Sequence, residues 1–216
     1  MDFNLFSYFT VDRRSELEAR LAGLRVDLYQ RMLEETAEIV AAADEAGHAG
    51  FGHPEHDLQI EGCEPSDAGF SASLHTAVFW ARNAGRPIVM SGNLDFCDLL
   101  WSTYREESRK WGHDIVAGRE AAWGGLLLCA PTDSEANERF EDFEWFWNRW
   151  SVPFGNQMPE LLVGSPDTIS ARIEAAQQRF GPGEAFMIVP QEIELAGRVC
   201  DPVGLFADKV MPRFSG

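Results

Sequence analysis

The chain has 216 residues, a size that suits one ordinary domain or two very small ones. Hydrophobic residues make up 45% and charged residues 25% of the sequence, which is the composition of a folded globular protein. The 35 acidic residues outnumber the 18 basic ones and give a formal charge of −17, which disfavours nucleic acids and anionic membranes as partners. No apolar run approaches the roughly 18 residues of a membrane span, and the acidic N-terminus lacks the basic region of a signal peptide. We therefore expect a cytoplasmic protein.

Short apolar runs alternate along the chain with segments whose apolar residues recur at helical spacing. In chain order the predicted elements are a strand at 3–8, a loop over 10–27, a helix over 28–46, a strand at 49–53, a turn-rich stretch at 61–70, a helix from Ser71 or Ser73 to about Ala84, a strand at 86–92, a helix over 95–111, a strand at 122–130, a helix over 132–150, a helix over 165–181, a strand at 185–190 and a short helix that begins at Asp201 and Pro202. This alternation predicts one α/β domain built on parallel strands.

Three segments together resemble one known family. The first is LYQRMLEETAEIVAAADEAGHAGFGHPEHDLQIEG, where a helix, a short strand and the sequence Glu55-His56-Asp57 follow one another. The second is GRPIVMSG with the later LWSTYREESRKWGHD, and the third is LLVGSPDTISARIEAAQQRFGPGEAFMIVP with the ending VGLFADKVMPRF. These segments cover most of the chain and resemble the bacterial luciferase-like monooxygenases.

The resemblance implies a TIM barrel, but a complete (β/α)8 barrel needs eight strands and about 250 residues. The segment SASLHTAVFWARNAGRPIVM resembles what comes much later in the family, so the middle of the barrel is missing. We expect a single domain over 1–216, an incomplete luciferase-like barrel with an internal deletion near 61–70. Unpaired sheet edges and bare apolar faces are costly, and pairing with a second copy would cover them, which predicts a homodimer.

His56 and Glu55 are the predicted catalytic residues. His56 follows a strand whose carboxyl end faces the barrel mouth, and imidazole exchanges protons near neutral pH. By the resemblance, it matches the family's first histidine after Glu, beside the flavin ring, whereas Asp57 replaces the second histidine. The alternative is a loop histidine that only hydrogen-bonds its neighbours. His53 and His56 form an HxxH pair, but the pair spans a strand end and a loop, and no metal site is predicted.

Ser71, Ser73 and Thr76 are the predicted cofactor-binding residues. Free N–H groups and small hydroxyls at the start of a helix form an anion site, and the resemblance places the family's flavin phosphate contacts at this helix. Ordinary N-capping explains one serine without any ligand. No Lys or Arg follows Thr76 until Arg82, so the phosphate would lack a guanidinium clamp.

Aromatic residues and cysteines have structural explanations. An aromatic cluster predicts helix packing, with a dimer face or a substrate pocket as alternatives; it comprises Phe140, Phe143, Trp145, Phe146, Trp147 and Trp150. No CxxC pair is present, which predicts buried, reduced thiols at Cys63, Cys97, Cys129 and Cys200.

Three functional hypotheses follow. The first is a flavin-dependent monooxygenase that acts on a small organic substrate with O2 and reduced FMN from a separate flavin reductase. A deazaflavin is an alternative cofactor, because the family uses both. The second is a non-catalytic flavin-binding relative, and the third is a repurposed, flavin-independent enzyme with no cofactor. Glu55, His56 and the helix-start hydroxyls favour the first hypothesis, whereas the missing barrel segment favours the other two.

Overall fold

The fold is described from a computed structural model of the chain. The structure describes residues 1–8, 26–52, 68–70, 73–89, 91, 93–115, 122–150, 152–154, 158, 161–190 and 196–214. Parallel strands and helices alternate through these ranges, which confirms the predicted α/β class. None of the helices described there is long and apolar enough to cross a membrane.

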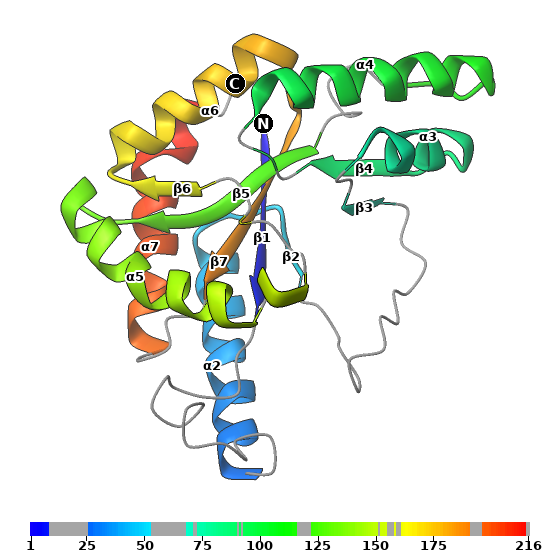
Figure 1. Ribbon diagram of the computed structural model, residues 1–216. Helices are drawn as coiled ribbons and strands as arrows, with labels where there is room; N and C mark the ends of the chain where they lie inside the picture. The colour runs from blue at the N-terminus through cyan, green and yellow to red at the C-terminus, as the bar shows by residue number, and fades with distance from the viewer. Residues whose placement is uncertain are drawn as a thin grey trace.

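One parallel sheet contains the strands (Figure 1). They are β1 (Asp2–Tyr8), β2 (Gly50–Gly52), β3 (Ala68–Phe70), β4 (Arg86–Val89), β5 (Ala122–Cys129), β6 (Leu161–Gly164) and β7 (Glu184–Pro190). The helices are α2 (Val26–Glu45), α3 (Leu74–Arg82), α4 (Leu94–Lys110), α5 (Asp133–Trp150), α6 (Pro166–Phe180) and α7 (Ala196–Lys209). Two 3₁₀ turns, η3 (Val152–Phe154) and η4 (Met211–Arg213), follow α5 and α7.

The five predicted strands are all present. Two further strands, β3 and β6, are not predicted from the sequence. β3 is three residues long in a stretch rich in turn formers, and β6 is a four-residue run too short to show a period. The predicted start of the last helix is also wrong, because α7 begins at Ala196 rather than Asp201. Likewise α2 begins at Val26, inside the predicted loop.

β5 is the central strand, and it changes neighbours halfway along its length. The strand order is β2-β1-β7-β5-β4-β3, and β6 pairs with β5 as well. At Ala122, β5 pairs with β7 and β4, whereas at Leu126 it pairs with β7 and β6. Since β7 keeps one edge of β5 at both residues, β4 and β6 follow one another on the other edge.

Two glycines, Gly124 and Gly125, lie where β5 changes neighbours. A Cβ on Gly124 would lie 1.5 Å from the carbonyl oxygen of Phe186 in β7, so only glycine permits this close approach. Along β5, β4 ends opposite Trp123 and β6 ends opposite Cys129. The carboxyl end of β6 therefore lies about 20 Å beyond that of β4 along the strand direction, at about 3.3 Å per residue.

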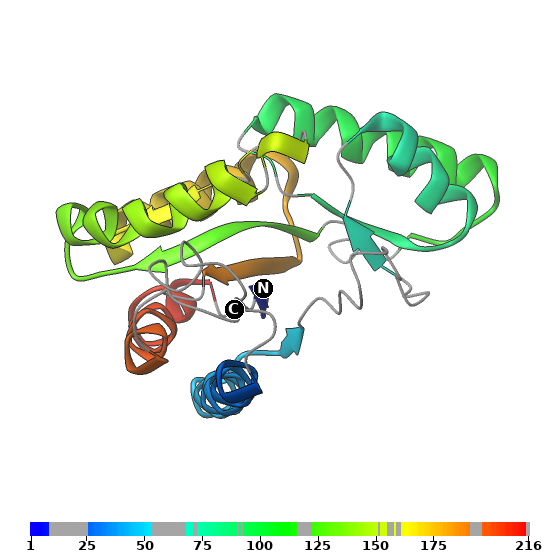
Figure 2. The same ribbon diagram turned by 60° about the horizontal axis from the view of Figure 1, so that its bottom comes forward.

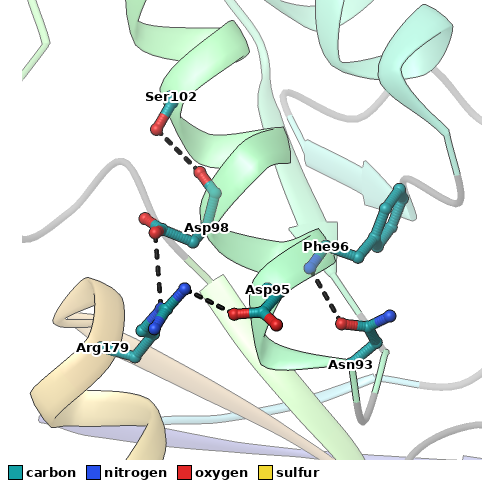
Figure 3. Close-up of polar contacts among 6 residues, drawn as sticks. All are labelled: Asn93, Asp95, Phe96, Asp98, Ser102 and Arg179. Atoms are coloured by element: carbon teal, nitrogen blue, oxygen red, sulfur yellow. Dashed lines mark hydrogen bonds and ion pairs between the residues drawn. The ribbon is translucent and has the colours of Figure 1, made fainter.

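This offset brings the last turn of α6 beside the first turn of α4 (Figure 3). Arg179 of α6 donates a hydrogen bond of 2.5 Å to Asp95 and pairs with Asp98 at 3.4 Å. Asn93 caps α4 by accepting a hydrogen bond from the Phe96 N–H at 3.0 Å. An acid at the start of one helix and a base at the end of the other also suit both helix dipoles.

Side chains of β5 alternate between two hydrophobic cores. Trp123, Leu127 and Cys129 belong to the core that also holds residues of α2, α3, α4, α6 and α7. Leu126 and Leu128 belong to the other core, which α5 covers. Figure 1 accordingly shows α5 and α7 on opposite sides of β5. We call the side of the sheet that α5 partly covers the inner face.

β2 and β3 are the two ends of the strand order, and each has one strand neighbour within the described part of the chain (Figure 2). They follow one another in sequence across residues 53–67, where the internal deletion is predicted. The two ends of the chain meet, because the Met1 amino group donates to the Phe214 carbonyl oxygen at 3.2 Å. The single domain and the deletion stay predictions.

Candidate functional site

The carboxyl ends of parallel strands lie together at one end of the sheet. The predicted site segments follow two of these strand ends. The predicted catalytic loop leaves β2 after Gly52, and the predicted phosphate-binding helix α3 follows β3. Several of the predicted residues lie outside the described ranges, namely His53, Glu55, His56, Asp57 and Ser71. Their roles stay predictions.

Ser73 and Thr76 lie at the start of α3 and form a capping box. The Ser73 hydroxyl accepts a hydrogen bond from the Thr76 N–H at 3.3 Å, and the Thr76 hydroxyl accepts one from the Ser73 N–H at 3.2 Å. The Thr76 hydroxyl also donates to the Ser73 carbonyl oxygen at 2.7 Å. Two of the three predicted phosphate ligands therefore already stabilise the helix start. By helix geometry the Leu74 and His75 N–H groups have no intrahelical acceptor, and an anion at α3 would meet them.

Part of the inner face is filled by the protein's own aromatic side chains. Phe140, Phe143 and Trp147 of α5 are buried against Leu126 and Leu128 of β5 and Val163 of β6. The Phe143 ring lies 5.9 Å from that of Phe140 and 5.8 Å from that of Trp147. Packing is thereby confirmed for these three aromatic residues. A ligand on the inner face must lie away from β6.

The rest of the inner face carries half-buried aromatic side chains. Asn4 pairs with Phe186, and Phe6 with Ile188, so the parallel register places all four side chains on the same face as Leu126. Ile188 is fully buried, whereas Asn4, Phe6 and Phe186 are half-buried. We call Asn4, Phe6 and Phe186 the aromatic floor.

Three strand residues that border the aromatic floor on the same face lack side chains: Gly50, Gly52 and Gly124. A Cβ on Gly50 would lie 2.8 Å from the Asn4 amide oxygen, and one on Gly52 would lie 3.1 Å from the Phe6 ring. The floor can present aromatic surface to a flat ligand and an amide to its polar groups. Sequence reasoning missed it, although the alternation in FNLFSY and in AFMIVP was the available signal.

At the ends of β5 and β6, Asp133 joins the starts of α5 and α6. Its Oδ1 accepts a hydrogen bond from the Ser165 N–H at 2.6 Å, and its Oδ2 accepts one from the Thr168 hydroxyl at 3.0 Å. These hydrogen bonds hold the pKa of Asp133 below its usual value. A Cβ on Gly164 would lie 2.9 Å from Oδ1. The carboxylate thus links the first residue of α5 to the N-cap and to the first turn of α6.

Cys97 and Cys129 are free, buried thiols, which confirms that prediction for two of the four cysteines. Burial raises the pKa of Cys129 to about 12, with a smaller opposing effect from Arg139, so this thiol is not a nucleophile at neutral pH. Among the residues that the structure describes, no three His, Cys, Asp or Glu side chains gather into a metal site.

No protein-family model matches the sequence, and no curated protein sequence matches it either. Flavoprotein 390 matches the structure with a TM-score of 0.66 and 11% identity, over 98% of this chain and 95% of that one. The FMN complex of the oxygenating constituent of 3,6-diketocamphane monooxygenase from Pseudomonas putida, a type II Baeyer-Villiger monooxygenase, matches with a TM-score of 0.57 and 19% identity, over 74% of this chain and 54% of that one. The monooxygenase RslO1 from Streptomyces bottropensis matches with a TM-score of 0.56 and 15% identity, over 97% and 68% of the two chains.

At such identities the likeness shows the fold. The chain spans about half the length of the diketocamphane monooxygenase constituent, at 54%, but 95% of flavoprotein 390. Its structural neighbours include members of the luciferase-like monooxygenase family, which confirms the resemblance found in the sequence. The chain therefore has a parallel α/β fold that matches luciferase-like TIM-barrel structures over part of their length.

Proposed function

We propose that the protein is a flavin-dependent monooxygenase of the luciferase-like type, which binds reduced FMN on its inner face and oxidises a small organic substrate with O2. The aromatic floor carries this proposal, because it offers half-buried ring surface beside missing Cβ atoms on the part of the inner face away from β6. The fold likeness to a monooxygenase constituent in complex with FMN supports it. The bound flavin would supply the oxygen chemistry.

The chain's own residues would have four tasks. Phe6 and Phe186 would contact the flavin ring, and the Asn4 amide would hydrogen-bond its polar edge. Glu55 and His56 would hold and transfer a proton beside the ring. The phosphate would lie at the start of α3, held by Ser71, Ser73 and Thr76.

The assembly around this site is part of the same proposal. Reduced FMN would come from a separate flavin reductase, with a deazaflavin as the alternative cofactor. The cytoplasmic protein would act as a homodimer that covers the ends of the sheet.

A second candidate function is flavin binding without turnover. Two observations favour it: α5 fills the inner face beside β6, and flavoprotein 390 matches nearly the whole of this chain and of its own. In the third candidate, a flavin-independent enzyme, the inner face would hold a different substrate.

Titration of the purified protein with oxidised and reduced FMN, followed by quenching of its 7 tryptophans, tests the first two candidates together. Phe186→Ala and Phe6→Ala should each weaken binding by about 3- to 10-fold, in line with the usual energy of an aromatic contact. The control is Phe79→Ala on α3, whose side chain is 57% exposed on the surface. Absence of quenching by either redox form would leave only the flavin-independent candidate.

Reoxidation of bound reduced FMN by O2, measured in a stopped-flow instrument, separates enzyme from binding protein. The monooxygenase proposal expects the bound flavin to reoxidise at a rate different from that of free FMN. His56→Ala should then reduce turnover on the order of 10²-fold, with FMN affinity unchanged. If FMN bound to the wild type and FMN bound to His56→Ala both reoxidise at the rate of free FMN, the result would support binding without turnover.

A further inference from the structure

The outward side of α2 carries a line of apolar residues. Val26, Leu33 and Val40 are 69%, 49% and 39% exposed, and their spacing of seven residues places them along one side of the helix. Ala37 lies between them and is also exposed. We call these four residues the apolar stripe. Ile39 and Ala43 of α2 are buried in the core, so these two residues, and not the stripe, attach α2 to the sheet.

Acidic side chains run parallel to the apolar stripe. Glu34, Glu38 and Glu45 are exposed, and their spacing of four and seven residues places them along a neighbouring line of the helix. We call them the acidic ridge. The single basic residue of α2, Arg31, is only partly exposed and pairs with Glu35 at 3.8 Å. No second basic residue within α2 is present to neutralise the negative charge of the acidic ridge.

We propose that α2 is a docking surface for a basic amphipathic helix of another protein. An apolar line beside an acidic line matches a partner helix that carries apolar residues beside Lys or Arg. A second copy of this chain would bring a second acidic ridge against the first, and this local repulsion disfavours self-association through α2. The stripe spans about 21 Å at about 1.5 Å per residue, so about four turns of a partner helix would cover it.

This inference is independent of the proposed function. α2 packs through Ile39 and Ala43 on the core opposite to the one that α5 covers, whereas the aromatic floor lies on the inner face. A partner on α2 would not contact the inner face. The two proposals therefore fail or succeed separately.

The test uses the full chain and two synthetic helical peptides of about 21 residues, which exceed the length of the stripe by about two turns. Both peptides carry Leu at heptad positions a and d; one carries Lys at e and g, and the other carries Glu there. We expect micromolar binding of the Lys peptide by fluorescence anisotropy, weakening as salt rises from 50 to 300 mM, and at least tenfold weaker binding of the Glu peptide.

Two pairs of variants locate the binding. The affinity for the Lys peptide should fall by tenfold or more in each of two double variants. One is Leu33→Ser with Val40→Ser, and the other is Glu34→Gln with Glu38→Gln. The matched controls are Leu99→Ser with Val152→Ser, at side chains 53% and 47% exposed, and Glu138→Gln with Glu141→Gln on the exposed side of α5. Both controls should bind the Lys peptide as the wild type does, and circular dichroism should show all variants folded.

Three results would overturn the proposal. One is no binding of the Lys peptide. Another is equal weakening by the control pairs, which would mean attraction by net charge alone. The third is a dimer in sedimentation that Leu33→Ser with Val40→Ser converts to a monomer, which would assign the stripe to a second copy of the chain.

Discussion

The Asp133 carboxylate accepts a hydrogen bond of 2.6 Å from the backbone N–H of Ser165, the N-cap residue of α6, so the first residue of α5 is bonded to the start of the neighbouring helix. The two residues are brought together because β5 and β6 end side by side, with Cys129 opposite Gly164. A negative side chain thus lies beside the N-terminus of α6, where it suits the helix dipole.

Removal of this carboxylate should destabilise the protein in a pH-dependent way. In Asp133→Ala the Ser165 N–H and the Thr168 hydroxyl lose their acceptor, and the unfolding midpoint in urea should fall. The folded-state pKa of Asp133 lies below its usual value of 3.8, so its contribution is complete above that value and is lost as pH falls through the folded pKa. The urea midpoints of the wild type and of Asp133→Ala should therefore converge in acid. Asp133→Asn, which keeps one acceptor oxygen, should recover part of the loss. Equal midpoints for all three proteins at pH 7 would contradict a stabilising role of these two hydrogen bonds.

Gly124→Ala should destabilise the fold by at least about 3 kcal/mol, because the new Cβ would lie 1.5 Å from the Phe186 carbonyl oxygen and must push β5 from β7. Gly204→Ala is the control. Gly204 lies within α7 and a Cβ there meets nothing within 4 Å, so alanine should stabilise the helix by about 0.5–1 kcal/mol. Urea unfolding measures both, and a Gly124→Ala protein as stable as the wild type would refute the close approach.

His48 should make the protein sensitive to mild acid. Burial lowers its pKa to about 4, with a smaller opposing effect from the Phe3 backbone, and its ring stacks on Phe206 at 6.2 Å. Because the unfolded chain takes up a proton below pH 6.5 and the folded chain does not, stability should fall between pH 6.5 and about 4.

Since the His48 ring is only partly buried, the loss should be on the order of 1–2 kcal/mol. His48→Phe keeps the stacking and should flatten the stability profile over that range, whereas the exposed His75→Phe on α3 should keep the wild-type profile. Parallel profiles for His48→Phe and the wild type would show that another group titrates.

Ser73→Ala distinguishes capping from phosphate binding at α3. Loss of the cap should cost about 1 kcal/mol of stability in either case. If the hydroxyl also holds the phosphate, affinity for FMN should fall by about fivefold while affinity for riboflavin, which lacks the phosphate, stays constant. Ser165→Ala removes the corresponding cap from α6 and should change neither affinity. An equal loss for both flavins would leave Ser73 as a cap only.

Much of the fold was readable from local patterns. The strand runs at 3–8 and 185–190 and the helix signals at Ser165 and Pro166 are confirmed, because hydrophobic period and capping act between residues near in sequence. The resemblance to luciferase-like proteins is confirmed at the level of the fold for the same reason, since its motifs are helix starts and strand ends.

Local sequence patterns do not predict that the residues of the aromatic floor lie together. Asn4, Phe6 and Phe186 come from segments about 180 residues apart, and their common face depends on the register of β1 with β7. The pairing of β4 and β6 with one edge of β5 likewise depends on strand partners that no short pattern encodes. The roles of His56, Glu55 and Ser71 stay predictions, because these residues lie outside the described ranges.

By itself the sequence determined an acidic α/β chain of alternating strands and helices. Charge and hydrophobic period are local properties, so they can be read without knowing which segments contact one another. Only the tertiary structure decided that α5 covers part of the inner face, that Asp133 bonds to the start of α6, and that α2 carries its apolar stripe outward. Each of these depends on which surfaces meet, and that choice is made by strand register and packing over the whole chain.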